Sequence, residues 1–254
     1  MKDYRFFIKE YLENRPDFFS FIRPQEALLF YTHIKMMKGP ILDYGCGDGF
    51  FAHTIFPKKT IDEGLDLESS RIKEAKKLDC YKNLQTYSGT TIPFEDNHFG
   101  TIISNCVFEH IPHIKNAVKE MHRVLKKDGL LMTSVMCSTW NENLLGGSLF
   151  GKKYINWFNG VQHHDSLLLK EQWRKLFKTT GYEIVEESDY LYKNASQKTE
   201  IYHYLSLFSL ITYTLFKKWK LIAFVSNKKI EEIEKLIIED KNNPSACFFV
   251  LRKG

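Results

Sequence analysis

Three glycines at alternate positions lie close to two carboxylates near the start of the chain. The stretch ILDYGCGDGFF begins at Ile41 with apolar residues and continues into Asp43, Gly45, Gly47, Asp48 and Gly49. A glycine-rich turn between a strand and a helix lets a ligand approach the backbone closely, and the helix N-terminus supplies free N–H groups. The spacing therefore predicts a cofactor site at this turn.

The charge around the turn discriminates between two cofactor classes. A dinucleotide fingerprint, GxGxxG, would require glycine where Phe50 stands. Asp43 and Asp48 would also bring negative charge beside a pyrophosphate, whereas they would attract an ammonium and a sulfonium. S-adenosylmethionine carries both of these cations, so we expect it to be the ligand.

Two stretches resemble the class I S-adenosylmethionine-dependent methyltransferases, in particular their small-molecule "type 11" branch. LDYGCGDG resembles motif I of that family. Downstream, YSGTTIPFEDNHFGTIISNCVFEHIPHIKNAVKEMHRVLKKDGLLMTSV resembles the family's succession of an LPF-like turn, a fourth strand, an EH-containing helix start and an RVLKPGG-like turn. The resemblance covers about residues 40–136 and implies methyl transfer with S-adenosylhomocysteine as the product.

The resemblance also implies which residues contact the cofactor. Asp66, about twenty residues after the turn, would accept hydrogen bonds from the ribose hydroxyls, although DLESS could instead use it as a helix N-cap. Leu67 would offer an apolar face to adenine, and Asn105 and Cys106 would line the methionine side. The expected cofactor-binding residues are Asp43, Gly45, Cys46, Gly47, Gly49, Asp66, Leu67, Ser88, Gly89, Thr90, Asn105 and Cys106.

Two positions depart from the family pattern. Ser88 stands where relatives usually carry an acidic residue for the adenine amino group, and Gly100 stands where they usually carry aspartate. The hydroxyl of Ser88 or Thr90 could accept a hydrogen bond from adenine, but a neutral hydroxyl is a weaker partner than a carboxylate. We therefore expect the departure at Ser88 to weaken the binding of adenine. Asn105 could equally be an ordinary loop residue.

Histidines supply the candidate bases. Methyl transfer is an in-line displacement, so the protein chiefly aligns the reactants and adds a base where the acceptor must lose a proton. His110 follows the fourth expected strand, at the edge where open α/β folds bind ligands, although Glu109 and His110 could simply cap or pack a helix start.

A second histidine motif lies in VQHHDS. His163 and His164 adjoin Asp165, and Tyr154, Trp157 and Phe158 precede them, which resembles a substrate lid in composition. These histidines could act as a base or contact substrate, lie in a surface loop, or bind metal. Adjacent histidines point in different directions and no third ligand cluster is evident, so we predict no metal site.

Composition sets the class of protein. The 254 residues are 43% apolar and 26% charged, which is typical of a globular protein. A net charge of +5 is too mild to indicate nucleic acid, and neither an NPPY-like motif nor a Pro-Cys nucleophile follows the fourth strand, so nucleic acid is disfavoured. Five scattered cysteines without CxxC spacing predict neither disulfides nor zinc, and the charged N-terminal stretch is not a signal peptide. A cytoplasmic location fits these features best.

Alternating strands and helices predict a parallel α/β sheet. Short apolar runs such as PILDY, TIDEGLDL and GTIISNC alternate with helical stretches, and βαβ crossovers place helices on both faces of such a sheet. The resemblance implies a Rossmann-like, seven-stranded methyltransferase fold, mostly parallel with an antiparallel last strand. We expect one domain over 1–254, with an N-terminal helical cap over about 1–38 that includes a helix starting at Pro24. Two irregular insertions are expected over about 137–170 and 191–244.

The second insertion contains an apolar run followed by lysines. LSLFSLITYTLF is too short to span a bilayer, and Lys217, Lys218 and Lys220 follow it, with Trp219 among them. Such a run can lie at a membrane surface, cover a lipophilic pocket or form a buried lid helix. We therefore expect either methyl transfer to an oxygen, nitrogen or carbon atom of a small, lipid-linked or sugar-linked acceptor, or a non-catalytic binding or membrane-surface scaffold protein. Peripheral contact with the inner membrane surface would involve about residues 205–220.

Overall fold

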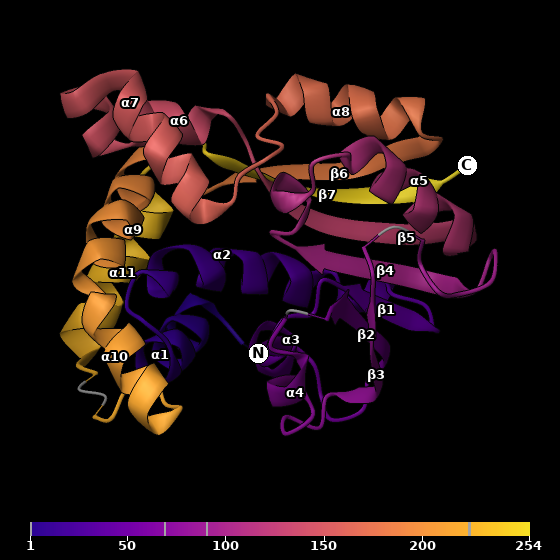
Figure 1. The fold of residues 1–254 in the computed structure, drawn as a ribbon, viewed down its shortest axis with the longest axis horizontal. Helices are drawn as coiled ribbons and strands as arrows, with labels where there is room; N and C mark the ends of the chain where they lie inside the picture. Colours follow the sequence, from indigo (N-terminus) through magenta and orange to yellow (C-terminus); the bar gives the residue numbers. More distant parts are fainter. Residues whose placement is uncertain (1, 69, 90, 223–224) are drawn as a thin grey trace. The chain divides into compact units, whose positions relative to one another are not determined.

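The chain forms two compact units. The computed structural model describes residues 2–68, 70–89, 91–222 and 225–254, and its fold is shown in Figure 1. A sheet unit comprises Phe30–Ser138, Asn159–Ser188 and Cys247–Gly254. A helical unit comprises Met1–Leu29, Thr139–Phe158 and Asp189–Ala246. The cap and the two insertions expected from the sequence thus supply most of the helical unit.

A seven-stranded sheet carries the fold. Its strands are β1 (Ile41–Tyr44), β2 (Ile61–Leu67), β3 (Tyr81–Tyr87), β4 (Phe99–Asn105), β5 (Leu125–Met136), β6 (Tyr182–Tyr190) and β7 (Ala246–Lys253), in the order β3-β2-β1-β4-β5-β7-β6. Pairing is parallel from β3 through β5, and the last strand is antiparallel. This arrangement confirms the predicted Rossmann-like methyltransferase fold. The strand order reverses direction between β1 and β4, which is where such sheets open a crevice for ligands.

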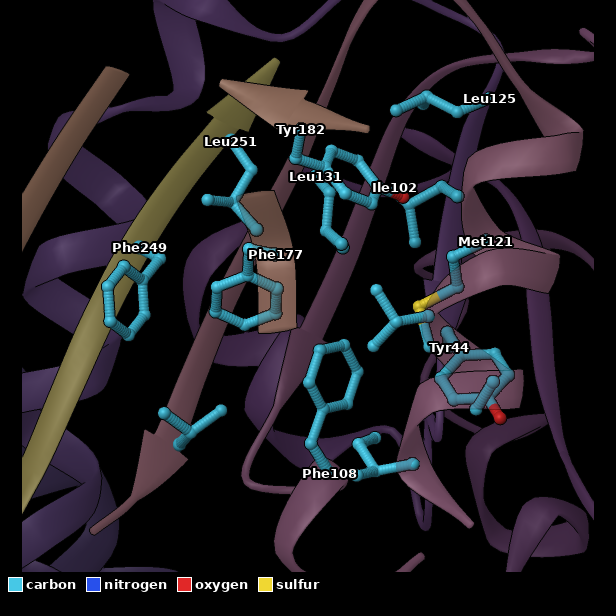
Figure 2. Close-up of a cluster of buried hydrophobic side chains, with 14 of the residues drawn as sticks. Tyr44, Ile102, Phe108, Met121, Leu125, Leu131, Phe177, Tyr182, Phe249 and Leu251 are labelled. Carbon is cyan, nitrogen blue, oxygen red and sulfur yellow. The ribbon is translucent and has the colours of Figure 1, made fainter. Parts of the chain in front are cut away.

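Helices cover both faces of the sheet unit. Its helical elements are the 3-10 turns η1 (Ile34–Met36) and η2 (Phe108–His110) and the helices α3 (Phe50–Ile55), α4 (Ile72–Ala75), α5 (Ile114–Val124) and α8 (Lys170–Thr179). Side chains of α5 and α8 join the strands in one buried cluster, in which Met121 and Phe177 lie over the sheet (Figure 2). Successive residues of β7 alternate between the faces: Phe249 packs against Phe177, whereas Phe248 packs against Phe30.

The helical unit contains α1 (Tyr4–Asn14), most of α2 (Phe19–Thr32), α6 (Thr139–Asn143), most of α7 (Leu145–Gln162), α9 (Lys193–Leu205), α10 (Leu207–Phe216) and α11 (Asn227–Glu239). The prediction of irregular insertions over 137–170 and 191–244 was therefore wrong, because both are largely helical. Glycine and asparagine obscured the helical signal, and α7 does break at Gly151, where φ is +69°. Hydrogen bonds within the unit help to stabilise these helices: the Asn143 side chain donates to the carbonyl of Asn243 and to the Ser245 hydroxyl.

The predicted helix start at Pro24 was also wrong. Helix α2 begins at Phe19, so Pro24 lies inside it. A proline at this position removes one backbone hydrogen bond, to the carbonyl of Ser20, but the residues before it still fold as helix. The amide side chain of Gln25 donates to the carbonyl of Phe21 at 2.7 Å and so satisfies one carbonyl of the first helical turns.

Gly100 departs from the family pattern for a structural reason. A Cβ atom at this position would lie 2.6 Å from the carbonyl oxygen of Lys38 and 2.7 Å from that of Gly39. The Gly100 N–H donates to the Pro40 carbonyl at 2.9 Å, which holds the approach to β1 against the start of β4. Gly100 therefore serves the backbone at the amino end of β4, away from the carboxyl ends of the strands.

The substitution Gly100→Ala tests this close approach. We expect it to lower the free energy of unfolding by about 1–3 kcal/mol, because backbone atoms cannot move aside as a flexible side chain can. Gly160→Ala is the matched control. Gly160 lies in the last part of α7, which belongs to the sheet unit as Gly100 does, and no atom lies within 4 Å of the added Cβ. That helical substitution is expected to raise stability by roughly 0.5–1 kcal/mol. Urea unfolding followed by circular dichroism measures both, and equal effects would contradict the assigned role of Gly100.

Candidate cofactor and active site

The glycine turn is held by the end of β2. The N–H groups of Gly45 and Cys46 donate to the Leu65 carbonyl, at 2.8 and 3.2 Å, and the Gly47 N–H donates to the Asp66 carboxylate at 2.5 Å. These three amides are therefore used inside the protein rather than offered to a ligand. The turn instead offers space, because nothing lies within 4 Å of a Cβ built on Gly47.

Glycine is required at position 45 because Val107, in the connection after β4, lies against it. Its φ is +78°, and a Cβ atom there would lie 2.4 Å from a methyl group of Val107. Val107 follows β4, so its side chain occupies the room that the missing Cβ of Gly45 leaves. The absence of a side chain at Gly45 thus brings the ends of β1 and β4 together beside the turn.

A pocket of about 410 Å³ opens next to this turn. This volume is in the range of small-ligand sites. The lining comes from the carboxyl ends of β1, β2, β3 and β4 and from η2 and the residues after it. The lining residues are Tyr44, Gly45, Asp66, Leu67, Tyr87, Ser88, Gly89, Cys106, Val107, His110, Ile111 and Pro112. Among these described residues Asp66 is the one carboxylate, and neither lysine nor arginine is present.

Asp66 is held in the lining of the pocket by two backbone donors. Its carboxylate accepts hydrogen bonds from the N–H groups of Gly47 and of Leu67, the latter at 2.7 Å. Burial raises the pKa of Asp66, and the two backbone bonds act against that rise. An ionised carboxylate offers about four lone-pair directions, so two backbone bonds leave capacity for two more donors. The adjacent Leu67 is 44% exposed and presents an apolar surface beside it.

Asp43 and Asp48 do not line the pocket. The buried Asp43 carboxylate lies behind the turn and accepts a hydrogen bond from the Tyr81 hydroxyl at 2.6 Å. Burial raises the pKa of Asp43 to about 7, and the nearby Asp66 adds to the rise. Asp48 accepts from the N–H of Phe50 and pairs with Arg71 at 3.4 Å. Both carboxylates thus organise the turn itself.

Some of the remaining predicted cofactor residues line the pocket and others do not. Ser88, Gly89 and Cys106 lie on the pocket wall, whereas Cys46, Gly47, Gly49 and Asn105 are outside its lining, and Thr90 lies outside the described residues. Asn105 accepts a hydrogen bond from Ser134 at 2.7 Å, which fixes the end of β4 against β5. Cys106 has a φ of +50°, a backbone conformation that is uncommon outside glycine.

Sequence reasoning missed five lining residues. Val107, Ile111 and Pro112 surround His110, and Tyr44 and Tyr87 end their strands. The Tyr87 hydroxyl donates to that of Tyr44 at 2.6 Å, which links β3 to β1 across β2. The available signal was that Tyr44 and Tyr87 end predicted strands and that residues 107–112 follow another, at the edge of the sheet that binds ligands.

His110 is brought to the pocket together with the paired histidines. Its Nδ1 lies 3.0 Å from the His163 carbonyl oxygen. A carbonyl only accepts hydrogen bonds, so Nδ1 carries the proton and Nε2 of the neutral ring is a proton acceptor. The His164 ring stacks on His110 with a 5.3 Å centroid separation. Burial, together with the neighbouring His110, lowers the pKa of His164 to about 3, so this ring is neutral at physiological pH.

Backbone hydrogen bonds hold the histidine segment in place. The N–H groups of Asp165 and Ser166 both donate to the Glu109 carbonyl, and the Ser166 hydroxyl donates to the Ile111 carbonyl at 2.7 Å. Within the described ranges, the Asp165 carboxylate bonds to neither histidine. Nor do those ranges contain three or more histidine, cysteine, aspartate or glutamate side chains grouped to hold a metal.

The aromatic residues of the expected lid form a separate cluster in the helical unit. The buried Glu200 carboxylate accepts hydrogen bonds from the N–H groups of Leu145 and Gly146 and from the Tyr154 hydroxyl. Phe158 stacks on Tyr154 with a 10° interplanar angle. Burial and the bond to Glu200 raise the pKa of Tyr154 well above its usual range. This cluster anchors the first part of α7 to α9.

The sheet order, the glycine turn and the pocket at the switch point define an S-adenosylmethionine-dependent methyltransferase domain of class I. Residues 42–133 match the family model Methyltransf_11, described as "Methyltransferase domain", and solved structures that share the fold include S-adenosylmethionine-dependent methyltransferases. S-adenosylmethionine is the cofactor of the class, and the lining of the pocket fits it.

Individual relatives are distant. The "Ubiquinone biosynthesis O-methyltransferase" of Bartonella quintana (strain Toulouse) is 23% identical over 174 residues, which cover 66% of this chain and 68% of the relative. The "Malonyl-[acyl-carrier protein] O-methyltransferase" of Legionella pneumophila is 27% identical over 110 residues, which cover 41% of this chain but 38% of the relative. A putative sarcosine dimethylglycine methyltransferase from Galdieria sulphuraria shares the fold, with a TM-score of 0.58, 18% identity and coverage of 91% of this chain and 86% of that one.

The raised pKa of the buried Asp43 predicts that the stability of the protein depends on pH. A folded-state pKa near 7, above the usual value near 4, means that the native state holds a proton which the unfolded state has released. The free energy of unfolding therefore falls as pH rises from about 4 to about 7, by at most about 1.4 kcal/mol per pH unit. Asp43→Asn removes this contribution. Urea unfolding at several pH values should show a wild-type stability that declines relative to the variant, and parallel curves would contradict the shifted pKa.

Proposed function

We propose that this protein transfers a methyl group from S-adenosylmethionine to a small or lipid-linked acceptor and releases S-adenosylhomocysteine. The observation that carries the proposal is the pocket at the switch point of the sheet, whose described lining holds Asp66 and no lysine or arginine. A pyrophosphate would lack a cationic partner there, whereas a nucleoside attached to a sulfonium and an ammonium suits a neutral to acidic lining. A sugar-linked acceptor is an alternative within the same proposal.

The residues of this chain have distinct roles in holding the cofactor. Asp66 would accept the ribose hydroxyls with the capacity that its two backbone bonds leave, and Leu67 would contact adenine. Gly47 would admit the cofactor to the backbone, because no neighbouring atom occupies that space. The sulfonium charge activates the methyl group, so the protein needs to align the acceptor and exclude water rather than activate the leaving group.

His110 is our candidate for the proton acceptor. It lines the pocket, and its Nδ1–H bond to the His163 carbonyl leaves Nε2 able to take a proton. When an acceptor hydroxyl oxygen forms its bond to the methyl carbon, the C–S bond breaks and the hydroxyl proton moves to Nε2. His163 and His164 would act through His110, the first by its backbone carbonyl and the second by stacking.

Oxygen is the acceptor atom that we favour over nitrogen or carbon. The two relatives described above are both named as O-methyltransferases, which supports oxygen chemistry on this scaffold. Val107, Ile111 and Pro112 make the wall around His110 apolar, which suits an acceptor with a hydrocarbon part. An uncharged, partly apolar hydroxyl compound attached to a lipid meets both conditions.

Asp66→Ala tests cofactor binding. Isothermal titration with S-adenosylmethionine and S-adenosylhomocysteine should show micromolar binding to the wild type and at least about tenfold weaker binding to the variant, because the ribose loses a charged hydrogen-bond partner. NAD should give no heat. Glu63→Ala is the control, since Glu63 lies on the same strand but bonds to Asn83 and Gln85. No binding by the wild type would favour the alternative of a non-catalytic binding or scaffold protein.

His110→Ala tests the proton acceptor. Methyl-labelled S-adenosylmethionine is first incubated with the enzyme and a cell extract, and label is expected in the organic phase on the lipid-linked acceptor. With that acceptor, the variant should lose about 10²–10⁴-fold in kcat while retaining cofactor affinity. His53→Ala, at an exposed histidine of α3, provides the control. Label confined to the aqueous phase would exclude the lipid-linked acceptor, and an unchanged kcat would exclude His110 as the base.

A further inference from the structure

Helix α10 exposes an unusually apolar surface. No residue of this helix is buried, which rules out the expectation of a buried lid helix. The α10 surface is defined here as the exposed apolar residues at the end of α9, along α10 and in the segment after it. Their side chains are 52% to 87% exposed, and they are Leu205, Leu207, Phe208, Leu210, Ile211, Leu215, Phe216, Leu221 and Ile222. Contiguous apolar surface of this kind marks an interaction site.

Three hydroxyl groups within this surface are satisfied by backbone carbonyls three or four residues earlier in the chain. The Ser206 hydroxyl donates to the Tyr202 carbonyl at 2.6 Å, that of Thr214 donates to the Leu210 carbonyl at 2.8 Å, and that of Thr212 donates to the Ser209 carbonyl at 3.0 Å. Serine and threonine use such bonds to satisfy their hydroxyls within a helix. The helix therefore presents mainly hydrocarbon outward. A protein partner would normally find about one hydrogen bond per 100–200 Å² of interface, and this surface offers few donors or acceptors for them.

Positive charge follows the apolar surface. Residues 201–230 contain five lysines and neither aspartate nor glutamate. Lys220 and Lys229 are occupied by Asp17, with which each forms an ion pair in the helical unit. Lys217 and Lys218 are exposed directly after α10. Their charge is thus available to an anionic partner next to the hydrocarbon.

Aromatic side chains stand at the junction between hydrocarbon and charge. Trp219 stacks on Tyr213 at a centroid distance of 4.2 Å, and the Lys217 ammonium lies 5.5 Å from the centroid of the Tyr213 ring. Tryptophan and tyrosine favour the boundary between a bilayer's headgroups and its hydrocarbon, where one part of the ring is apolar and another is wet. Exposed apolar residues, a half-buried aromatic pair and exposed lysines are thus adjacent along residues 205–222, which is a combination that membrane-surface helices use.

We propose that the α10 surface inserts into the headgroup region of an anionic phospholipid bilayer. Across the described ranges the chain has no helix with the length and apolarity needed to cross a membrane, so this contact would lie on one side of the bilayer. Helix α10 has ten residues and would therefore be about 15 Å long, lying in the plane of the interface. The proposal does not rest on methyl transfer, although it would place the enzyme at the surface where a lipid-linked acceptor resides.

Vesicle flotation tests the proposal without any cofactor. The full chain is mixed with vesicles of phosphatidylglycerol and phosphatidylcholine, or of phosphatidylcholine alone, and floated through a sucrose gradient. We expect wild-type protein to float with the anionic vesicles and at least about tenfold less with the neutral ones, because each exposed lysine contributes to attraction by anionic lipid. The double variant Lys217→Glu, Lys218→Glu should lose this preference.

Apolar insertion is tested by a second pair of variants. Phe208→Asp with Leu215→Asp should reduce flotation by at least about tenfold, since both side chains would otherwise leave water for the bilayer. Ile238→Asp is the matched control, because Ile238 is a 49% exposed aliphatic residue of α11 outside the α10 surface. Circular dichroism checks that each variant is folded.

Three outcomes would overturn the proposal. One is wild-type protein that remains at the bottom of the gradient with anionic vesicles, and another is a Phe208→Asp, Leu215→Asp variant that floats as the wild type does. The third is a dimer, detected by light scattering, that this variant dissociates while vesicle binding is absent; the α10 surface would then be covered by a second copy of the chain. Titration with S-adenosylmethionine is independent of all three, so failure here leaves the proposed enzymatic function standing.

Discussion

The architecture of the pocket depends on how the end of β2 holds the glycine turn. Consecutive N–H groups of Gly45, Cys46 and Gly47 bond to the Leu65 carbonyl and to the Asp66 carboxylate. Because these three amides bond within the protein, they cannot cradle a phosphate, which needs free N–H groups. The bond from the Gly47 N–H also orients the Asp66 carboxylate, so the position of that carboxylate depends on the geometry of the turn. Parallel pairing of β1 with β2 sets that geometry, which makes the cofactor site a direct product of the sheet register.

The three aspartates around the turn illustrate how burial separates similar residues into different roles. Asp43 lies behind the turn under the Tyr81 hydroxyl, Asp48 organises the start of α3, and Asp66 alone faces the pocket. The pocket is therefore less negative than three carboxylates in the sequence suggest. Burying charge is costly, and the raised pKa of Asp43 records that cost. The described lining thus has one oriented carboxylate and no lysine or arginine that could bind a phosphate.

The sheet was predictable because its signal is local. Each strand is a short apolar run, and the glycine turn follows β1 directly, so the order of residues along the chain was enough to predict a parallel α/β sheet and the edge that carries the pocket. The seven strands and the antiparallel last strand were implied by the family resemblance. The helices of the two insertions were not predictable in this way, because α7 contains glycines and is stabilised by distant partners such as Glu200. Tyr44 and Val107 were missed since their contribution depends on contacts across strands. Gly100 was recognised only as a departure from the family pattern, because the constraint on it comes from the backbone that precedes β1, which only three-dimensional packing reveals.

The position of β7 in the sheet governs the order in which the protein can fold. This strand lies between β5 and β6, yet it is synthesised after both of them and after α9, α10 and α11. While the chain is growing, β5 and β6 thus have strand edges without their partner, and Phe177 of α8 lacks Phe249. Unpaired edges invite association with other chains. Closure of the sheet must wait until Ala246–Lys253 leaves the ribosome, so a nascent chain interrupted before β7 would be a natural client of chaperones.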